Sequence, residues 1–190
     1  NSGEIVIDKN LTIKKADGAT SAILNANSNH SGSPPADAPA VKHRIFTVRV
    51  GSTLTLDNIT LQGGMAEGSE QNKHGGGVYV DGTLIMKGSS KITDCSAAGE
   101  GGGLFLYGTC TLQDSSSITH CEAGDYGGGV FVDYSGTSIL NINGGSITMN
   151  HTKKVPSSSG HGGGVYVRGN TSNKGKVYMT SGEISGNKAG

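Results

Sequence analysis

Short runs in which apolar and polar residues alternate recur along the chain. The clearest run follows a glycine triplet, as in Gly75–Val80 (GGGVYV), and returns with the triplets that begin at Gly101, Gly127 and Gly162. The interval is 26 residues twice (101−75 and 127−101) and then 35 (162−127). Internal repeats of this length are typical of solenoids and other repeat arrays.

Two further apolar runs complete each repeat. The first alternates with a period of two, as in Thr83–Met86, and the second ends in Cys or Asn, as in Ile92–Cys95 and Ile147–Asn150. Period-two alternation rich in Val, Ile, Thr and Tyr predicts β-strands, and glycine triplets are unfavourable inside a helix. Each repeat is therefore expected to form a coil of three short strands, and the coils to stack as a parallel β-solenoid.

The same spacing, without the glycines, extends toward the N-terminus. Phe46–Val50 takes the place of the first strand in one earlier coil and Ile5–Ile7 in another. In this register Val50 precedes Leu54 by the same step that separates the first two strands of the glycine-containing coils. The expected fold is all-β: a right-handed parallel β-helix, a pectate-lyase-like solenoid of about six coils, with the handedness taken from the bias of parallel crossovers.

One β-helix domain is expected over residues 1–190. Insertions interrupt the repeat near 25–43, 63–73, 134–138, 152–160 and 169–174. Such insertions are where solenoids place their individual binding features. The last residues, 187–190, resemble those that precede a glycine triplet, and no capping coil follows them, so we expect this domain to be a piece of a longer solenoid.

The outward position of the first strand holds an aromatic residue in four successive coils. In the register above, this row reads Val6, Arg49, Tyr79, Phe105, Phe131 and Tyr166. Stacked aromatic pairs stiffen a sheet by roughly 0.2–1 kcal/mol each, and this is the interpretation that we favour. An exposed aromatic stripe is also typical of a recognition surface. If the row binds a ligand, Tyr79, Phe105, Phe131, Tyr166 and Arg49 are the candidate residues, and a glycan or a peptide is the candidate ligand.

Composition narrows the classes of partner. Hydrophobic residues make up 33% of the chain, Trp is absent, and 15 basic residues balance 15 acidic ones. A neutral chain offers no electrostatic capture of nucleic acid or of an anionic membrane. No apolar run approaches the roughly 20 residues of a membrane span, so we expect no nucleic-acid partner and no membrane-spanning segment.

Titratable residues near the aromatic row do not form a recognisable catalytic arrangement. Asp81 and Asp133 fall two coils apart, about 10 Å, whereas a retaining glycosidase needs its carboxyl groups about 5–5.5 Å apart. His74 and His161, each just before a glycine triplet, fall three coils apart and are interpreted as turn residues. We predict no catalytic residue, no metal site and no cofactor.

The three cysteines are expected to be buried. Cys95 and Cys121 lie one repeat apart, at the position that Asn150 and Asn187 hold in the next two coils. Asn side chains at such a position can hydrogen-bond along the stack. A disulfide between the two cysteines remains open, but facing residues of stacked coils are not guaranteed its geometry, and free thiols are favoured. Cys110 is interpreted as a small apolar core residue.

The glycine phrase Gly76-Gly77-Val78, paired with Ile147–Asn150 and Ile184–Asn187, resembles the repeats of polymorphic outer-membrane proteins and similar autotransporter-type β-helix passengers. The resemblance covers about residues 75–190, and it departs from that family's pattern in having Ile where Phe is frequent and Cys at positions 95 and 121. It implies a non-catalytic bacterial protein, extracellular or on the outer-membrane surface, that acts in adhesion or host interaction with a host glycan or protein. Those repeats are structural, so no functional residue is carried over.

Two other functions remain open. Many β-helices of the pectate-lyase type are polysaccharide lyases or glycoside hydrolases, which gather several Asp with Lys or Arg on one strand face. A structural stalk would have the same coils without a ligand. Fold alone does not distinguish among the three.

Overall fold

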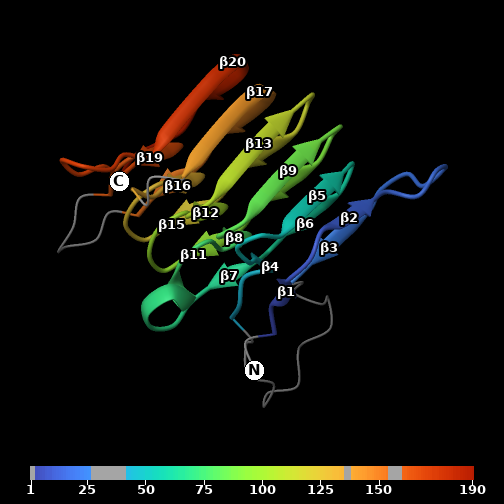
Figure 1. The fold of residues 1–190 in the computed structure, drawn as a ribbon, viewed down its shortest axis with the longest axis horizontal. Coiled ribbons are helices and arrows are strands. Elements are labelled where there is room, and N and C mark those ends of the chain that lie inside the picture. The colour runs from blue at the N-terminus through green and yellow to red at the C-terminus, as the bar shows by residue number, and fades with distance from the viewer. Residues whose placement is uncertain (1–2, 27–41, 135–137, 154–159) are drawn as a thin grey trace.

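The computed structural model describes residues 3–26, 42–134, 138–153 and 160–190, which form a parallel β-helix (Figure 1). Its strands belong to three sheets, and every pairing between named strands is parallel. Among these residues the one helical element is a 3-10 turn, η1 (Glu70–Lys73). The expected all-β parallel solenoid of about six coils is confirmed.

The first sheet takes one strand from each coil. In order along the stack it contains β1 (Ile5–Ile7), β4 (Phe46–Val48), β8 (Val78–Val80), β12 (Leu104–Leu106), β16 (Val130–Val132) and β19 (Val165–Val167). The shortest sheet contains β7 (Met65–Ala66), β11 (Ser96–Ala97), β15 (Glu122–Ala123) and β18 (His151–Thr152).

The largest sheet has two arms that share two long strands, β17 (Ile139–Thr148) and β20 (Lys176–Ser185). One arm contains β2 (Leu11–Lys14), β5 (Thr53–Asp57), β9 (Thr83–Lys87) and β13 (Thr109–Gln113). The other contains β3 (Ile23–Asn25), β6 (Thr60–Gln62), β10 (Lys91–Thr93) and β14 (Ser117–Thr119).

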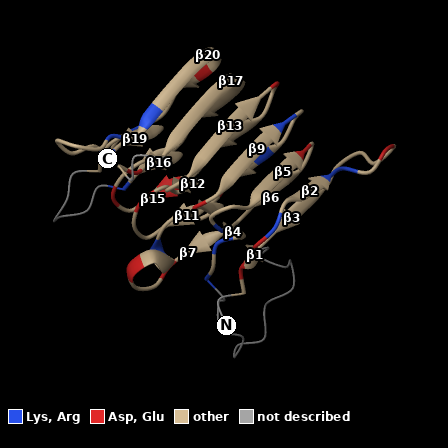
Figure 2. Ribbon diagram, in the orientation of Figure 1, with Lys and Arg blue, Asp and Glu red and all other residues tan. Residues whose placement is uncertain are grey.

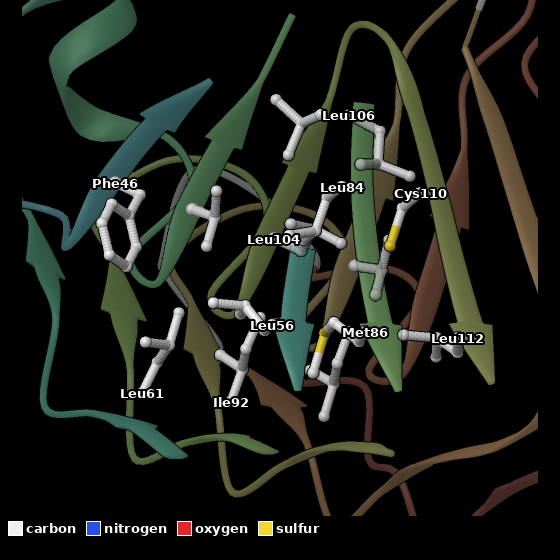
Figure 3. Close-up of a cluster of buried hydrophobic side chains, with 14 of the residues drawn as sticks. Phe46, Leu56, Leu61, Leu84, Met86, Ile92, Leu104, Leu106, Cys110 and Leu112 are labelled. Atoms are coloured by element: carbon white, nitrogen blue, oxygen red, sulfur yellow. The ribbon is translucent and has the colours of Figure 1, made fainter. Parts of the chain in front are cut away.

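Alternation along the strands fills a single core between the sheets (Figure 3). Leu84 and Met86 of β9 are fully buried, and so are Cys110 and Leu112, their partners on β13 in the next coil. Each fully buried aliphatic side chain contributes about 1.5–3 kcal/mol, which makes this core the main source of stability. Met179 also occupies an inward position, but it is 47% exposed because β20 pairs with a described strand, β17, on one edge only.

The glycine triplets are required at the corner that precedes the first sheet. Gly101 has φ +69°, and a Cβ atom on Gly102 would lie 2.4 Å from the carbonyl oxygen of Gly128 in the next coil. An L side chain is strained at the first position and has no space at the second. The triplets therefore let neighbouring coils approach closely before each strand begins.

The expected register of Phe46–Val50 is wrong by two residues. Phe46 pairs with Val78 and Val48 with Val80, while Val50 is 75% exposed. The turn from β4 to β5 is residues 49–52, whereas the turn from β8 to β9 is only residues 81–82. A shift of two leaves the same side chains facing the core, so the apolar pattern does not reveal it.

Two of the predicted insertions can be followed in the structure. In residues 63–73, β7 is a regular strand of the shortest sheet that pairs with β11, and η1 follows it; Gly169 pairs with Lys174 in a short antiparallel bridge. The insertions predicted near 25–43, 134–138 and 152–160 lie mostly outside the described residues.

Candidate functional site on the first sheet

Four aromatic side chains stack along the outward face of the first sheet, and we call them the ladder: Tyr79, Phe105, Phe131 and Tyr166. They are paired in register on β8, β12, β16 and β19. Consecutive ring centroids lie 5.0, 5.0 and 5.6 Å apart, with interplanar angles of 8°, 10° and 15°. Offset stacking at these distances is favourable, so the ladder links four coils side chain to side chain.

Arg49 does not belong to this row. Thr47 pairs with Tyr79 on one side and with Val6 on the other. Arg49 instead follows β4, where its N–H donates to the carbonyl of Ile7, and its side chain is exposed. It therefore lies beside the ladder's row, two positions farther along the chain.

The expectation of an exposed ladder is wrong for its two central rings. Phe105 is 5% exposed and Phe131 is fully buried. The ring of His74 lies 5.0 Å from that of Phe105, and the guanidinium of Arg168 lies 5.2 Å from the ring centroid of Phe131. A ligand has no access to these two rings while their cover is in place.

Glu100 joins the two covering side chains. Its Oε2 lies 2.9 Å from Nδ1 of His74, and its Oε1 accepts a hydrogen bond of 3.2 Å from Nη2 of Arg168. Nδ1 of His74 also lies 3.0 Å from the backbone N of Glu100, so it accepts that N–H when Nδ1 carries no proton and donates to the carboxylate when it carries one. Burial favours the neutral carboxyl, but the hydrogen bond from His74 and the charges of His74, Arg168 and Lys73 outweigh it and lower the pKa of Glu100.

Arg44 covers the N-terminal end of the ladder. Its guanidinium lies 5.0 Å from the ring centroid of Tyr79, pairs with Glu4 at 3.2 Å and donates to the carbonyl of Gln71 at 2.6 Å. Burial lowers the pKa of Arg44, although Glu4 opposes the shift. Burial, followed by the negative charge of Asp81, raises the pKa of Tyr79 to about 12, which keeps its hydroxyl protonated at neutral pH.

The opposite end of the ladder offers aromatic surface to solvent. Tyr126 stacks on His161 at 5.6 Å with an interplanar angle of 5°, and its ring lies 4.7 Å from that of Tyr166. Tyr126 and Tyr166 are half-buried, whereas His161 is exposed. We call these three residues the aromatic edge. His161 was interpreted from the sequence as a turn residue; the position before a glycine triplet, which it shares with Tyr126, was the signal that the two stack.

A second row of polar side chains lies next to the ladder. It contains Asp81, Tyr107, Asp133 and Arg168, and their backbone N–H groups donate to successive coils of the first sheet. Asp133 is 8% exposed and accepts the N–H of Tyr134 at 2.6 Å. Asp81 and Asp133 have the coil of Tyr107 between them, so they lie two coil steps apart.

Charged side chains are otherwise sparse on the strands and lie largely at turns (Figure 2). In the described part of the chain, no group of three or more His, Cys, Asp or Glu residues is close enough to hold a metal ion. No helix found there is long and apolar enough to cross a membrane.

Comparisons with known proteins assign no family. No family model matches the chain, and neither a curated protein nor a solved structure shows significant similarity to it.

Proposed function

We propose that the protein is a non-catalytic β-helix of a bacterial surface or secreted protein, and that it acts in adhesion through the first sheet. The resemblance of its repeats to polymorphic outer-membrane proteins and autotransporter passengers supports the location. The observation that carries the binding role is the aromatic edge, in which Tyr126 stacks on His161 and contacts Tyr166 at a partly exposed position.

The aromatic edge has the chemistry of a sugar-binding surface. Tyrosine rings present an apolar face together with a polar hydroxyl, and they are common in recognition sites. Arg168 lies nearby, with its side chain 39% exposed and its guanidinium over the ring of Phe131. A host glycan, with C–H groups on one face and hydroxyls at its rim, is the partner that this surface suits best.

Binding is tested with a glycan array and with immobilised host-matrix proteins. The intact protein is compared with a Tyr126→Ser/Tyr166→Ser variant and with Tyr178→Ser, which removes an aromatic side chain that is 53% exposed on β20. We expect the double variant to lose binding and the Tyr178→Ser control to keep it. Equal binding by all three proteins would remove the aromatic edge from consideration.

A structural stalk is the second candidate, and the covered ladder favours it. Phe105 and Phe131 stack with their neighbours instead of facing solvent, so the most regular feature of the surface links coil to coil. A stalk binds none of the arrayed glycans or matrix proteins. Release of reducing ends or unsaturated sugars from a polysaccharide in the same assays would point to a lyase or hydrolase instead.

A further inference from the structure

Two of the three cysteines face one another inside the solenoid. Cys95 and Cys121 occupy the same corner of adjacent coils, since Thr93 pairs with Thr119 just before them and Ser96 with Glu122 just after. Their exposed fractions are 1% and 0%, and both are free thiols. Equivalent atoms of the two residues are therefore expected about one strand spacing apart, roughly 4.8 Å.

The sulfur atoms keep similar orientations. Sγ of Cys95 lies 3.3 Å from the carbonyl oxygen of Thr93, and Sγ of Cys121 lies 3.3 Å from that of Thr119. Sγ of Cys121 also lies 3.9 Å from the carbonyl oxygen of Ile92, in the coil of Cys95. The two thiols therefore lie at the same corner of successive coils with their sulfur atoms oriented alike.

We propose that Cys95 and Cys121 form a linear two-thiolate site for one soft divalent cation of the Hg(II) type. Two metal–sulfur bonds of about 2.3 Å, the length found in zinc thiolates, span about 4.6 Å when placed end to end. This span matches the roughly 4.8 Å between coils, so one ion fits between equivalent sulfur atoms of adjacent coils. A disulfide would require Cβ atoms about 3.5–4.5 Å apart and a bond of about 2.05 Å, and the coils would have to approach.

Charge and ligand number select the cation. Two thiolates and a divalent ion form a neutral complex, whereas a monovalent ion would leave a net negative charge in an apolar corner, which is costly. Zn(II) takes four ligands. The neighbouring Asp94 and His120 have positive φ values and are exposed, so the corner presents two sulfur donors to its interior.

Binding of Hg(II) releases the thiol protons of Cys95 and Cys121. Both cysteines are free, and burial, followed by the neighbouring Cys95, raises the pKa of the Cys121 thiol. Two S–H bonds break, two Hg–S bonds form, and two protons leave to solvent with no change in oxidation state. Affinity is therefore expected to rise with pH.

The chain offers matched controls for this site. Asn150 and Asn187 occupy the corner in the next two coils, where the Asn150 side chain accepts the N–H of Cys121 at 2.9 Å. Cys95→Asn and Cys121→Asn therefore replace the thiols with a residue that this corner already accommodates. Cys110 is a third buried thiol, on β13, and Cys110→Ser leaves the pair intact.

The reduced protein is titrated with HgCl2 against a monothiol competitor, followed by thiolate-to-metal absorption and native mass spectrometry. We expect one Hg(II) per chain, bound with loss of two protons, in the intact protein and in Cys110→Ser. The double Asn variant, and each single Asn variant should the double fail to fold, loses this complex. Equal retention of Zn(II), an unchanged complex in the Asn variants, or a purified protein already lacking two hydrogens through a Cys95–Cys121 disulfide would overturn the proposal.

Discussion

Arg168 and Glu100 form an ion pair across the ladder although 68 residues separate them in the chain, with Nη2 of Arg168 3.2 Å from Oε1 of Glu100. Glu100 precedes the strand of Phe105, and Arg168 follows the strand of Tyr166. The pair therefore spans the coil of Phe131 between them and keeps that ring out of solvent.

Removing the charge of Glu100 should weaken this cover. Glu100→Gln is expected to lower the free energy of unfolding by about 1–2 kcal/mol, since a partly buried carboxylate loses two charge-assisted partners. Urea denaturation measures the change. Glu122→Gln is the matched control, because Glu122 pairs with His151 and Lys153 at a more exposed position. An exposed pair contributes less than about 1 kcal/mol, and a larger loss in the control would contradict this ranking.

The contribution of Glu100 should depend on pH in one direction. The pKa of Glu100 is lowered in the folded protein from its ordinary value of 4.5, so the folded state favours the ionised carboxylate. The resulting stability is fully present above that ordinary value, and it is lost as the pH falls through the folded-state pKa. Urea denaturation of the intact protein and Glu100→Gln from about pH 5 to about pH 3 should show their difference shrinking with acidification. A difference that grows toward acid would contradict the assignment.

The buried part of the ladder should matter more for stability than exposed aromatic residues do. Phe131→Ala is expected to cost about 3–5 kcal/mol, because the ring is fully buried and its loss leaves a cavity. Tyr178→Ala, on an outward position of β20, should change stability by less than about 1 kcal/mol. Thermal unfolding followed by circular dichroism distinguishes the two. Similar losses in both variants would mean that Phe131 is not packed as described.

Alanine substitutions at two glycines distinguish the effect of a steric clash from that of backbone strain. Gly102→Ala places a Cβ atom 2.4 Å from the carbonyl oxygen of Gly128, so neighbouring coils must move apart. Gly51→Ala has open space within 4 Å, but its φ of +78° is strained for an L residue, at about 1–2 kcal/mol. We expect Gly102→Ala to lower the urea midpoint more than Gly51→Ala does. The reverse order would indicate that the corner adapts easily.

The fold could be predicted from the sequence because its signals repeat. The recurring phrases at Gly75, Gly101 and Gly127 fix the length of a coil, and alternation within each run identifies the inward side chains. The same regularity predicted that Phe105 and Phe131 stack. These features depend on local pattern and on equal spacing, both of which a single sequence contains.

The cover over the ladder could not be predicted in the same way. It depends on how far the side chains of Glu100 and Arg168 reach, across a separation of 68 residues and two coil steps. The position of Arg49 was missed for a different reason. A strand shifted by two residues keeps its inward face, and only the lengths of the turns distinguish the two registers.

The corrected register makes a final prediction at Thr47. This residue pairs with Tyr79, and its Oγ1 is buried without a hydrogen-bond partner in the described part of the chain. An unsatisfied buried hydroxyl is unfavourable, and valine has nearly the same shape, so Thr47→Val should stabilise the protein by about 0.5–1 kcal/mol. Arg49→Val alters an exposed turn and should change stability by less than about 0.5 kcal/mol. Urea denaturation of both variants tests the register: stabilisation by Arg49→Val but not by Thr47→Val would place Arg49 in the ladder's row after all.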